Sequence, residues 1–258
     1  MFFETHAHYD DEKFDADREE LISSLFSQGQ IDYIANAGCD VKSSLTGLEL
    51  SRKWKNFYAA SGIHPHSADE MNDESYEIIK KLCDDPKCVA VGEIGLDYYY
   101  DFCDREVQRC CFRRQLELAA EVDLPVIIHS REAAAETFNI IKESNVRKGI
   151  IHSYSGHTQM ALEYIEMGFY IGIGGMVTFK NAKKPVEVVK NIPLERIVLE
   201  TDSPYLAPVP VRGQRNNSQN LRYIAEKISE IKQISLEKVA ETTRNNALTI
   251  FAKKIVVA

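Results

Sequence analysis

The chain has 258 residues, of which 44% are hydrophobic and 27% charged, a composition typical of a globular protein with a large buried core. Its formal net charge of −8 excludes a global basic field, so any attraction of a phosphate-bearing substrate must come from a few local cations. The six cysteines include no CxxC pair, which excludes a zinc ribbon and a small disulfide framework. With no leader-like start and no apolar run of about 18 residues, we predict a reduced, cytoplasmic protein that does not enter a membrane.

Eight short apolar runs rich in Ile, Val and Tyr alternate with longer amphipathic segments. Several runs are almost wholly apolar, as expected of parallel strands covered on both faces. Among the predicted helices, 17–29 has an apolar stripe that includes Ile22 and Leu25 and ends at Gly29, and 105–122 is rich in helix formers. The predicted strands span residues 1–6, 31–38, 57–65, 88–95, 124–130, 149–155, 169–175 and 196–202.

The alternation of eight strands with helices favours a single (β/α)8 TIM barrel over an open sheet. No Gly-rich dinucleotide turn follows the first strand, and the length fits a barrel of about 250 residues. The tail from about 217 to 253 is expected to form two helices that close the structure. Because no linker, internal repeat or low-complexity tract interrupts the chain, we predict one domain over residues 1–258.

Polar residues lie at the carboxyl ends of the predicted strands, where barrel enzymes hold their reactive groups. In FETHAHYD (3–10), His6 and His8 are two apart, so both imidazoles face the same way from the first strand. Alone, this pair could equally be two solvent-facing histidines near a terminus. All seven histidines of the chain, however, fall on or just beyond predicted strand ends and none falls on a predicted helix, which indicates a shared polar mouth. The polar residues at the later strand ends are His64, Glu93, His129, His152 and Asp202.

Four imidazoles and two carboxylates are too many ligands for one tetrahedral ion, and they suit two divalent ions. Glu93, between apolar neighbours in VGEIG, is the natural bridging ligand, because each of its oxygens can bind one ion. The alternative is a buried carboxylate paired with a Lys or Arg. Asp202 could bind a metal and take a proton from an attacking water, so Glu93 and Asp202 are the candidate catalytic residues. The predicted metal ligands are His6, His8, Glu93, His129, His152 and Asp202.

Seven motifs resemble, in order from residue 3 to about 220, those of the TatD-type metal-dependent deoxyribonucleases of the amidohydrolase superfamily. They are FETHAHYD, GIHPH, VGEIGLDYY, VIIHSRE, IHSYSG, GMVTFKNA and VLETDSPYLAPVPVRGQRN. The resemblance implies that the first-strand histidines and Asp202 hold one ion, that His129 and His152 hold the other, and that Glu93 bridges them. It also implies two-metal activation of water to cleave the phosphodiester bonds of DNA, from a 3′ end and preferring single strands. Mg²⁺, Mn²⁺ and Zn²⁺ all stay open as the two divalent ions.

Two motifs depart from the family pattern without losing a ligand. The family commonly continues RGxRNEP, whereas this chain reads RGQRNNSQN, with Asn217 and Ser218 in place of Glu and Pro. The family usually shows HCFSG where residues 152–156 read HSYSG. The first departure could alter the loop over the substrate, so the substrate preference transfers less securely than the metal site.

Four residues are candidate substrate contacts. His64 in GIHPH either orients a phosphate or supports a ligand, or it packs beside Pro65. Arg131 and Lys180 are candidate phosphate contacts, because an acidic protein needs local cations to hold a polyanion. Each could also be a solvated loop charge. Tyr205 is expected to shape the pocket.

An aromatic segment, DYYYDF (97–102), directly follows the strand of Glu93. Exposed rings there could stack on unpaired bases, at roughly 1–3 kcal/mol each. In the alternative, one or two of them pack over the neighbouring helix. The rings concerned are Tyr98, Tyr99, Tyr100 and Phe102.

Three functions remain open at the level of the sequence. A metal-dependent phosphodiesterase acting on DNA is the leading hypothesis. The runner-up is a small-molecule hydrolase of the same superfamily that cleaves an amide, lactone or phosphate ester; many of these carry a carboxylated Lys where this chain has Glu93. The third is a metal-bound scaffold without catalysis. The sequence points to no obligate protein partner and no membrane.

Overall fold

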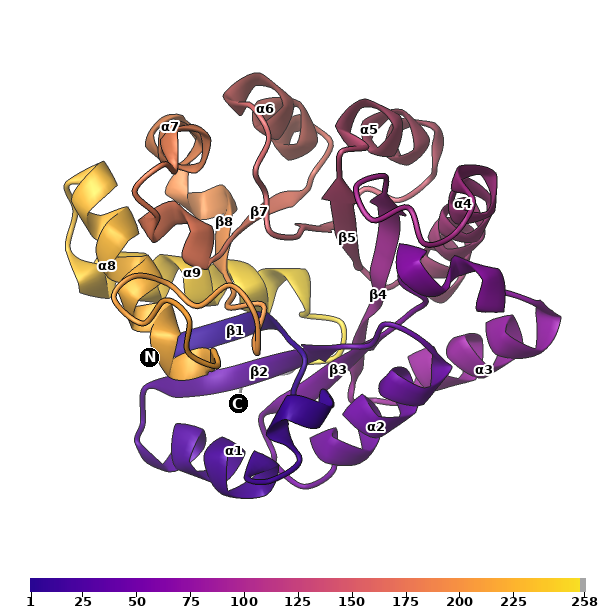
Figure 1. Ribbon diagram of the computed structural model, residues 1–258, viewed down its shortest axis with the longest axis horizontal. Coiled ribbons are helices and arrows are strands. Elements are labelled where there is room, and N and C mark those ends of the chain that lie inside the picture. The colour runs from indigo at the N-terminus through magenta and orange to yellow at the C-terminus, as the bar shows by residue number, and fades with distance from the viewer. Residues whose placement is uncertain (256–258) are drawn as a thin grey trace.

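Eight parallel strands, hydrogen-bonded in chain order, form one sheet that curves into a barrel surrounded by helices (Figure 1). The computed structural model describes residues 1–255, so residues 256–258 of the predicted domain lie outside it. The predicted (β/α)8 fold is confirmed. The strands are β1 (Phe2–Ala7), β2 (Ile31–Ala37), β3 (Phe57–Ser61), β4 (Cys88–Asp97), β5 (Val126–Arg131), β6 (Gly149–Ile151), β7 (Tyr170–Ile173) and β8 (Ile197–Leu199).

Helices connect the strands and continue beyond β8, where the two predicted tail helices are α8 and α9. Gly29, at φ +68°, follows the end of α1 as expected. No helix within residues 1–255 combines the length and the apolar character needed to cross a membrane. The α-helices are α1 (Arg18–Ser27), α2 (Val41–Ser51), α3 (Asp73–Asp84), α4 (Arg105–Val122), α5 (Ala134–Glu143), α6 (Thr158–Glu166), α7 (Lys183–Asn191), α8 (Leu221–Lys232) and α9 (Leu236–Ile250). Short 3-10 turns are η1 (Glu12–Phe14), η2 (Pro65–Glu70), η3 (Gly175–Thr178), η4 (Leu194–Arg196) and η5 (Ser218–Asn220).

The barrel closes where the end of β1 meets the segment after β8. The Asp202 N–H donates to the carbonyl of His6 at 3.0 Å, and the His8 N–H donates to the carbonyl of Ser203 at 2.7 Å. Ala7 and Ser203 also form an isolated parallel bridge. Closure therefore brings two of the predicted site histidines beside a predicted carboxylate ligand from the other end of the chain.

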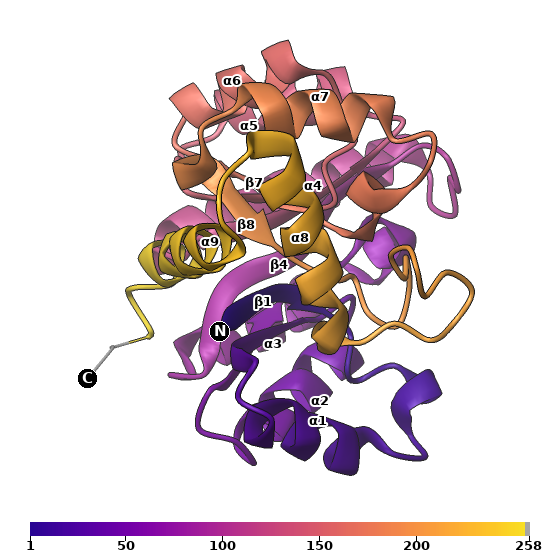
Figure 2. The ribbon, with the colours of Figure 1, turned by 90° about the vertical axis from the view of Figure 1, so that its left-hand side faces the viewer.

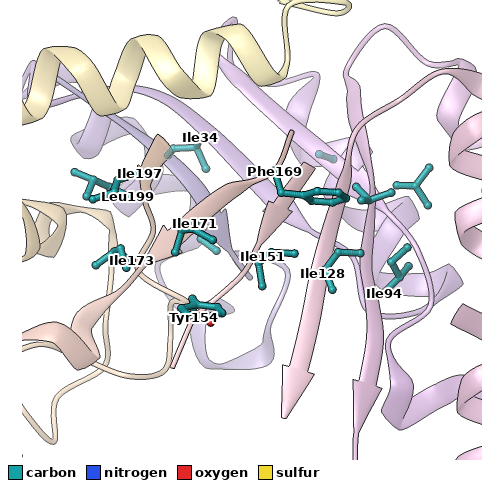
Figure 3. Close-up of a cluster of buried hydrophobic side chains, with 14 of the residues drawn as sticks. Ile34, Ile94, Ile128, Ile151, Tyr154, Phe169, Ile171, Ile173, Ile197 and Leu199 are labelled. Carbon is teal, nitrogen blue, oxygen red and sulfur yellow. The ribbon is translucent and has the colours of Figure 1, made fainter. Parts of the chain in front are cut away.

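An apolar layer lies between the strands and the surrounding helices. Figure 3 shows part of it, with isoleucine side chains standing on neighbouring strands of the barrel. Burying such side chains contributes roughly 1.5–3 kcal/mol each. Members of this layer labelled in the figure include Ile94, Ile128, Ile151, Ile171 and Leu199.

A second apolar layer fills the barrel interior near the amino ends of the strands. The α9 helix lies beside the start of β1 (Figure 2), and Phe251, just beyond it, packs against Phe3 with ring centroids 5.5 Å apart. This layer blocks the amino end, so the interior is a packed core rather than a pore. It includes Phe3, Val89, Ile127, Ile150, Val198 and Phe251.

Several strands end earlier than predicted, because the chain turns at the site. β6 stops at Ile151 instead of 155, and Ser153 then adopts φ +46°. β8 stops at Leu199 instead of 202, and Asp202 adopts φ +59°. In β4, Gly95 has φ +146°, and a Cβ there would lie 1.9 Å from the carbonyl oxygen of His129. These left-handed positions free the polar side chains from the regular ladder.

Candidate metal centre

The carboxyl ends of the strands surround a cavity of about 830 Å³ that holds most of the predicted site residues. His6 lies beneath its floor and is fully buried. Lys180, in contrast, is exposed after η3 and is not among the residues that line the cavity. The predicted residues that do line it are His8, His64, Glu93, His129, Arg131, His152, Asp202 and Tyr205.

The two carboxylate oxygens of Glu93, which is 3% exposed, face different sets of imidazoles. Oε2 lies 3.2 Å from Nε2 of His6 and 3.6 Å from Nε2 of His8. Oε1 lies 2.8 Å from Nδ1 of His129, 3.6 Å from Nε2 of His64 and 3.9 Å from Nε2 of His152. Glu93 thus stands at the centre of the cluster, between two groups of nitrogen donors.

Asp202 completes the cluster from the β8 side. Its Oδ1 lies 3.4 Å from Nε2 of His8 and 3.8–3.9 Å from Nε2 of His6 and His152. The rings of His6 and His152 stack with centroids 3.6 Å apart, whereas His152 and His129 are 6.4 Å apart. His152 therefore sits nearer to His6 than to His129, with which the sequence resemblance groups it.

The remaining ring nitrogens of several imidazoles meet oxygen atoms outside the cluster. Nδ1 of His8 is 2.9 Å from the carbonyl oxygen of Ala37, so in the neutral ring Nε2 carries the lone pair and faces Glu93. Nε2 of His129 is 3.2 Å from Oδ2 of Asp97. A partner of this kind fixes the orientation of an imidazole and raises its basicity as a ligand.

In His64 the ring nitrogen that faces the cavity carries the proton. Its Nδ1 accepts a hydrogen bond from the backbone N–H of His66 at 3.1 Å, so the proton of the neutral ring resides on Nε2. Burial and the nearby His129 hold the pKa of His64 well below its ordinary value, which keeps the ring neutral. His64 therefore presents an N–H donor to the cavity.

The carboxylates of the cluster are ionised despite their burial. Burial alone would raise the pKa of Glu93, but the imidazoles of His6, His64 and His152 hold it well below its usual value. Burial likewise would raise the pKa of Asp202, but the hydrogen bond with His8 and the charges of His152 and His6 together lower it. Two negative charges are thus concentrated on the floor of the cavity.

These residues fit divalent cations. Within residues 1–255, Glu93 and Asp202 form ion pairs only with histidines and with no Lys or Arg, so no permanent cation balances them. Nδ1 of His6 is buried without a hydrogen-bond partner. Two groups of side chains have ligand atoms close enough to share an ion: His6, His152 and Asp202; His6, His8 and Glu93. In a third group, His64, Glu93 and His129, the proton on Nε2 of His64 leaves Glu93 and His129 as the ligands.

Comparison with known proteins identifies the family. The TatD-related DNase family matches residues 3–252. The chain belongs to this family. It is 42% identical to a Bacillus subtilis protein named uncharacterized metal-dependent hydrolase YabD, over 97% of this chain and 99% of that one. It is 30% identical to the 3′-5′ ssDNA/RNA exonuclease TatD of Salmonella typhimurium, over 93% and 94%. The crystal structure of the TatD homologue YjjV from Escherichia coli superposes with a TM-score of 0.91 at 31% identity, over 97% and 98%.

This chain is therefore a metal-dependent hydrolase of the TatD family. Two carboxylates of the TatD barrel escaped the sequence prediction. Asp97, 1% exposed, lies beside His129 and accepts from Nε2 of His66 at 2.8 Å. Glu200 is fully buried, with Oε1 3.1 Å from Nδ1 of His152. A signal was available, since Glu200 stands two residues before Asp202, the same spacing as His6 and His8.

The departures from the TatD pattern do not reach the cavity. The Tyr154 hydroxyl donates to the carbonyl of His157 at 2.7 Å, away from the cluster. Asn217 caps η5, and the N–H of Ser218 donates to the hydroxyl of Tyr9 at 2.9 Å. Ser218 thus contacts Tyr9, just beyond β1, and neither Asn217 nor Ser218 lines the cavity.

The two remaining histidines differ in their relation to the cavity. His66, just beyond the predicted strand 57–65, lies within the 3-10 turn η2. Because η2 follows β3 closely, His66 still lines the cavity. His157 is exposed at the N-cap of α6 and does not line it.

Proposed function

We propose that this TatD-family hydrolase cleaves the phosphodiester bonds of single-stranded DNA from the 3′ end, with Glu93 and Asp202 as catalytic residues. The observation that carries the proposal is the placement of Glu93, whose two oxygens face separate sets of imidazoles on the floor of an open cavity. A carboxylate so placed suits a bridge between two ions.

Two divalent ions, with Mg²⁺, Mn²⁺ and Zn²⁺ as candidates, are proposed to bind this cluster. His6, His8 and Asp202 would hold one, His129 and His152 the other, with Glu93 shared. When bound, such ions activate water as a nucleophile and neutralise charge on the phosphate. The oxygen partners of His8 and His129 support ligand roles for these imidazoles, because they orient each ring toward Glu93.

The chain's own groups supply the remaining steps. Asp202, ionised and beside the cluster, would accept the proton released when water attacks phosphorus. The Nε2–H of His64 would donate to a phosphate oxygen. Arg131 and Tyr205, both in the cavity wall, would hold the strand beside the reacting bond.

The choice of substrate is supported by the printed activity of the Salmonella relative, a 3′-5′ ssDNA/RNA exonuclease, which shares 30% identity over 93% of this chain. The cavity also lies open at the rim of the barrel, where a strand end can reach the cluster. Hydrolysis of RNA, or of a small ester or lactone, are the competing outcomes of the test.

The test is an end-labelled oligonucleotide assay on protein loaded separately with Mg²⁺, Mn²⁺ or Zn²⁺. With a 5′ label on single-stranded DNA, we expect a ladder that shortens one nucleotide at a time and disappears with EDTA. The same strand in duplex form should be cleaved more slowly. Intact DNA beside hydrolysed lactone, amide or phosphate monoester would overturn the proposal in favour of a small-molecule hydrolase.

A further inference from the structure

Exposed aromatic rings gather at one place on the molecule. Within residues 1–255 four large aromatic side chains are exposed, and one of them, Tyr205, is in the cavity wall. The other three belong to the loop between β4 and α4 and form what we call the aromatic ledge: Tyr99, Tyr100 and Phe102, which are 60%, 47% and 68% exposed. Tyr100 and Phe102 also line the cavity that holds Glu93. A cluster of exposed rings beside a reactive site is typical of a binding surface.

The rings of the ledge are ordered against one another. Tyr100 and Phe102 stack with centroids 5.3 Å apart and an interplanar angle of 24°. Tyr99 meets Tyr100 edge-on at 5.0 Å. Beneath them, His66 packs against Tyr100 and Phe102 at 5.3 and 4.8 Å. The ledge therefore offers ring surfaces to the solvent in a fixed arrangement.

Tyr98 shows what a structural ring of this segment looks like. Arg105 covers its face at 4.4 Å, and its hydroxyl donates to Glu136 on α5 at 2.6 Å. Tyr98 thus packs over the neighbouring helices, one of the two outcomes considered for this segment. The three rings of the ledge are 47–68% exposed, although Arg131 lies over Tyr99 and Tyr100, so packing does not account for them.

One buried carboxylate ties the ledge to the metal cluster. Oδ1 of Asp97 accepts from the backbone N–H groups of Tyr99 and Tyr100, each at 3.0 Å. Its Oδ2 meets the imidazoles of His66 and His129 at 2.8 and 3.2 Å. The position of the rings is therefore fixed relative to the cluster.

The charges of the cavity rim favour a polyanion on the side of the ledge. Arg131, the one Lys or Arg among the described residues that line the cavity, stacks its guanidinium over Tyr99 and Tyr100 at 4.1 and 4.7 Å. The rim after β1 and β2 instead carries carboxylates of Asp10, Asp11 and Asp40. Phosphates are attracted to the first side and repelled from the second.

We propose that the aromatic ledge binds the bases of an unpaired nucleic acid strand by stacking, while Arg131 holds an adjacent phosphate and the strand end reaches Glu93. This inference rests on the proposed function and names where the strand lies. Stacking needs free ring faces on the bases, so a duplex gains nothing from the ledge. Every base has such a face, so the ledge selects unpaired strands without selecting sequence.

The test measures binding separately from cleavage. The full chain, with Ca²⁺ in place of a catalytic ion, is titrated against two fluorescein-labelled hexamers of equal charge, one of thymidine and one of abasic sites. Gel analysis after each titration confirms that the strands are intact. We expect wild-type protein to bind the thymidine hexamer about tenfold or more tightly than the abasic one.

The variant Tyr99→Ala/Phe102→Ala is expected to lose this preference, because both rings are removed. Tyr99→Phe keeps a ring and should retain it. Tyr223→Ala, on α8 and outside the cavity wall, is the matched control and should bind both hexamers as the wild type does. Metal content and thermal melting of each variant show whether the cluster and the fold are intact.

Equal affinity of wild-type protein for the two hexamers overturns the ledge proposal, and so does an unchanged preference in the double variant. These results are independent of hydrolysis. If the ledge variant loses base preference while the wild type cleaves no nucleic acid, the ledge stands and the proposed function fails. If the wild type cleaves DNA yet ignores the bases, only the ledge proposal fails.

Discussion

The barrel interior has two ends that are built from the same strands. The lower end, at the amino ends of the strands, is apolar, and the upper end, at their carboxyl ends, is polar. In β5 the inward side chain Ile127 belongs to the second apolar layer, and His129, two residues later, belongs to the polar cluster. In β6 the same step leads from Ile150 to His152. In β8 it leads from Val198 to Glu200, beside that histidine. Because side chains two residues apart share a face, one strand contributes to both ends.

Side chains that stabilise the fold and side chains of the polar cluster are thus only two residues apart on the same strands. At the amino end, each side chain finds apolar neighbours and lowers the free energy of the folded state. At the carboxyl end, Glu93 and Asp202 are buried beside imidazoles, so the folded state carries the desolvation cost of charged groups. Burial of apolar side chains at the lower end therefore offsets the desolvation cost at the upper end.

The largest expected effect comes from neutralising the centre of the upper end. Glu93→Gln removes the charge that faces both imidazole sets, and we expect the loss of several kcal/mol of catalytic stabilisation, about a thousandfold in rate. Bound metal should fall in parallel, as measured by elemental analysis, while the metal-free variant should still melt cooperatively. A variant that keeps its metals and its hydrolysis rate would contradict the proposed role of Glu93.

The converse substitution acts at the lower end. Phe3 is 2% exposed and stacks on Tyr33 at 5.1 Å. Phe3→Ala should lower the free energy of unfolding by about 3–5 kcal/mol in urea titrations, through lost burial and a cavity. Metal content per folded molecule should stay unchanged. Loss of metal at denaturant concentrations where the variant is still folded would mean that the two ends are not separable.

The sequence was sufficient to predict the barrel and to indicate which polar residues lie at its carboxyl rim. Apolar runs spaced by amphipathic segments specify strands and helices through burial alone, so the barrel followed from periodicity. The convergence of His6, His64 and His152 followed from the fold, because parallel strands deliver their carboxyl ends to one rim. His6 lies on β1 as predicted, whereas His64 and His152 lie just past β3 and β6, which end before the predicted bounds.

What the sequence could not supply is the set of contacts behind the ligands. Asp97 reads as an ordinary strand-end acid, and only the register of β4 and β5 brings it to His129. The polarity of His64 depends on a backbone N–H two residues away in a turn that no periodicity predicts. Lys180 looked equivalent to Arg131 in sequence, yet it lies outside the cavity wall because η3 carries it away.

Asp97 gives a third way to examine the upper end, since it supports the cluster from outside. Asp97→Asn keeps the size of the side chain but removes the charge that orients His129. We expect metal affinity to fall about 10–100-fold, measured by chelator competition. Activity should return at high metal concentration, in contrast to Glu93→Gln. If activity does not return at high metal concentration, Asp97 takes part in the reaction and does not act through metal binding alone.

A fourth prediction uses the proton that the upper end holds when no cation is bound. Burial alone would lower the pKa of His152, but Glu200 and Glu93 raise it to about 9, so the ring is protonated at neutral pH. A metal needs the neutral ring and must displace that proton. Affinity should therefore rise about tenfold per pH unit from about 7 to 9 and level off above. Glu200→Gln should move this rise to lower pH, and a flat profile in wild-type protein would exclude the competition.

The smallest expected effect separates two cations at the rim of the upper end. Arg131 lines the cavity and Lys180 does not. Each phosphate contact adds about 0.7 to the slope of log Kd against log salt for a single strand. Arg131→Gln should thus reduce the slope for a thymidine hexamer by about that amount, whereas Lys180→Gln should leave it unchanged. An equal reduction in both variants would mean that the strand extends over η3, so that the binding surface includes residues outside the cavity wall.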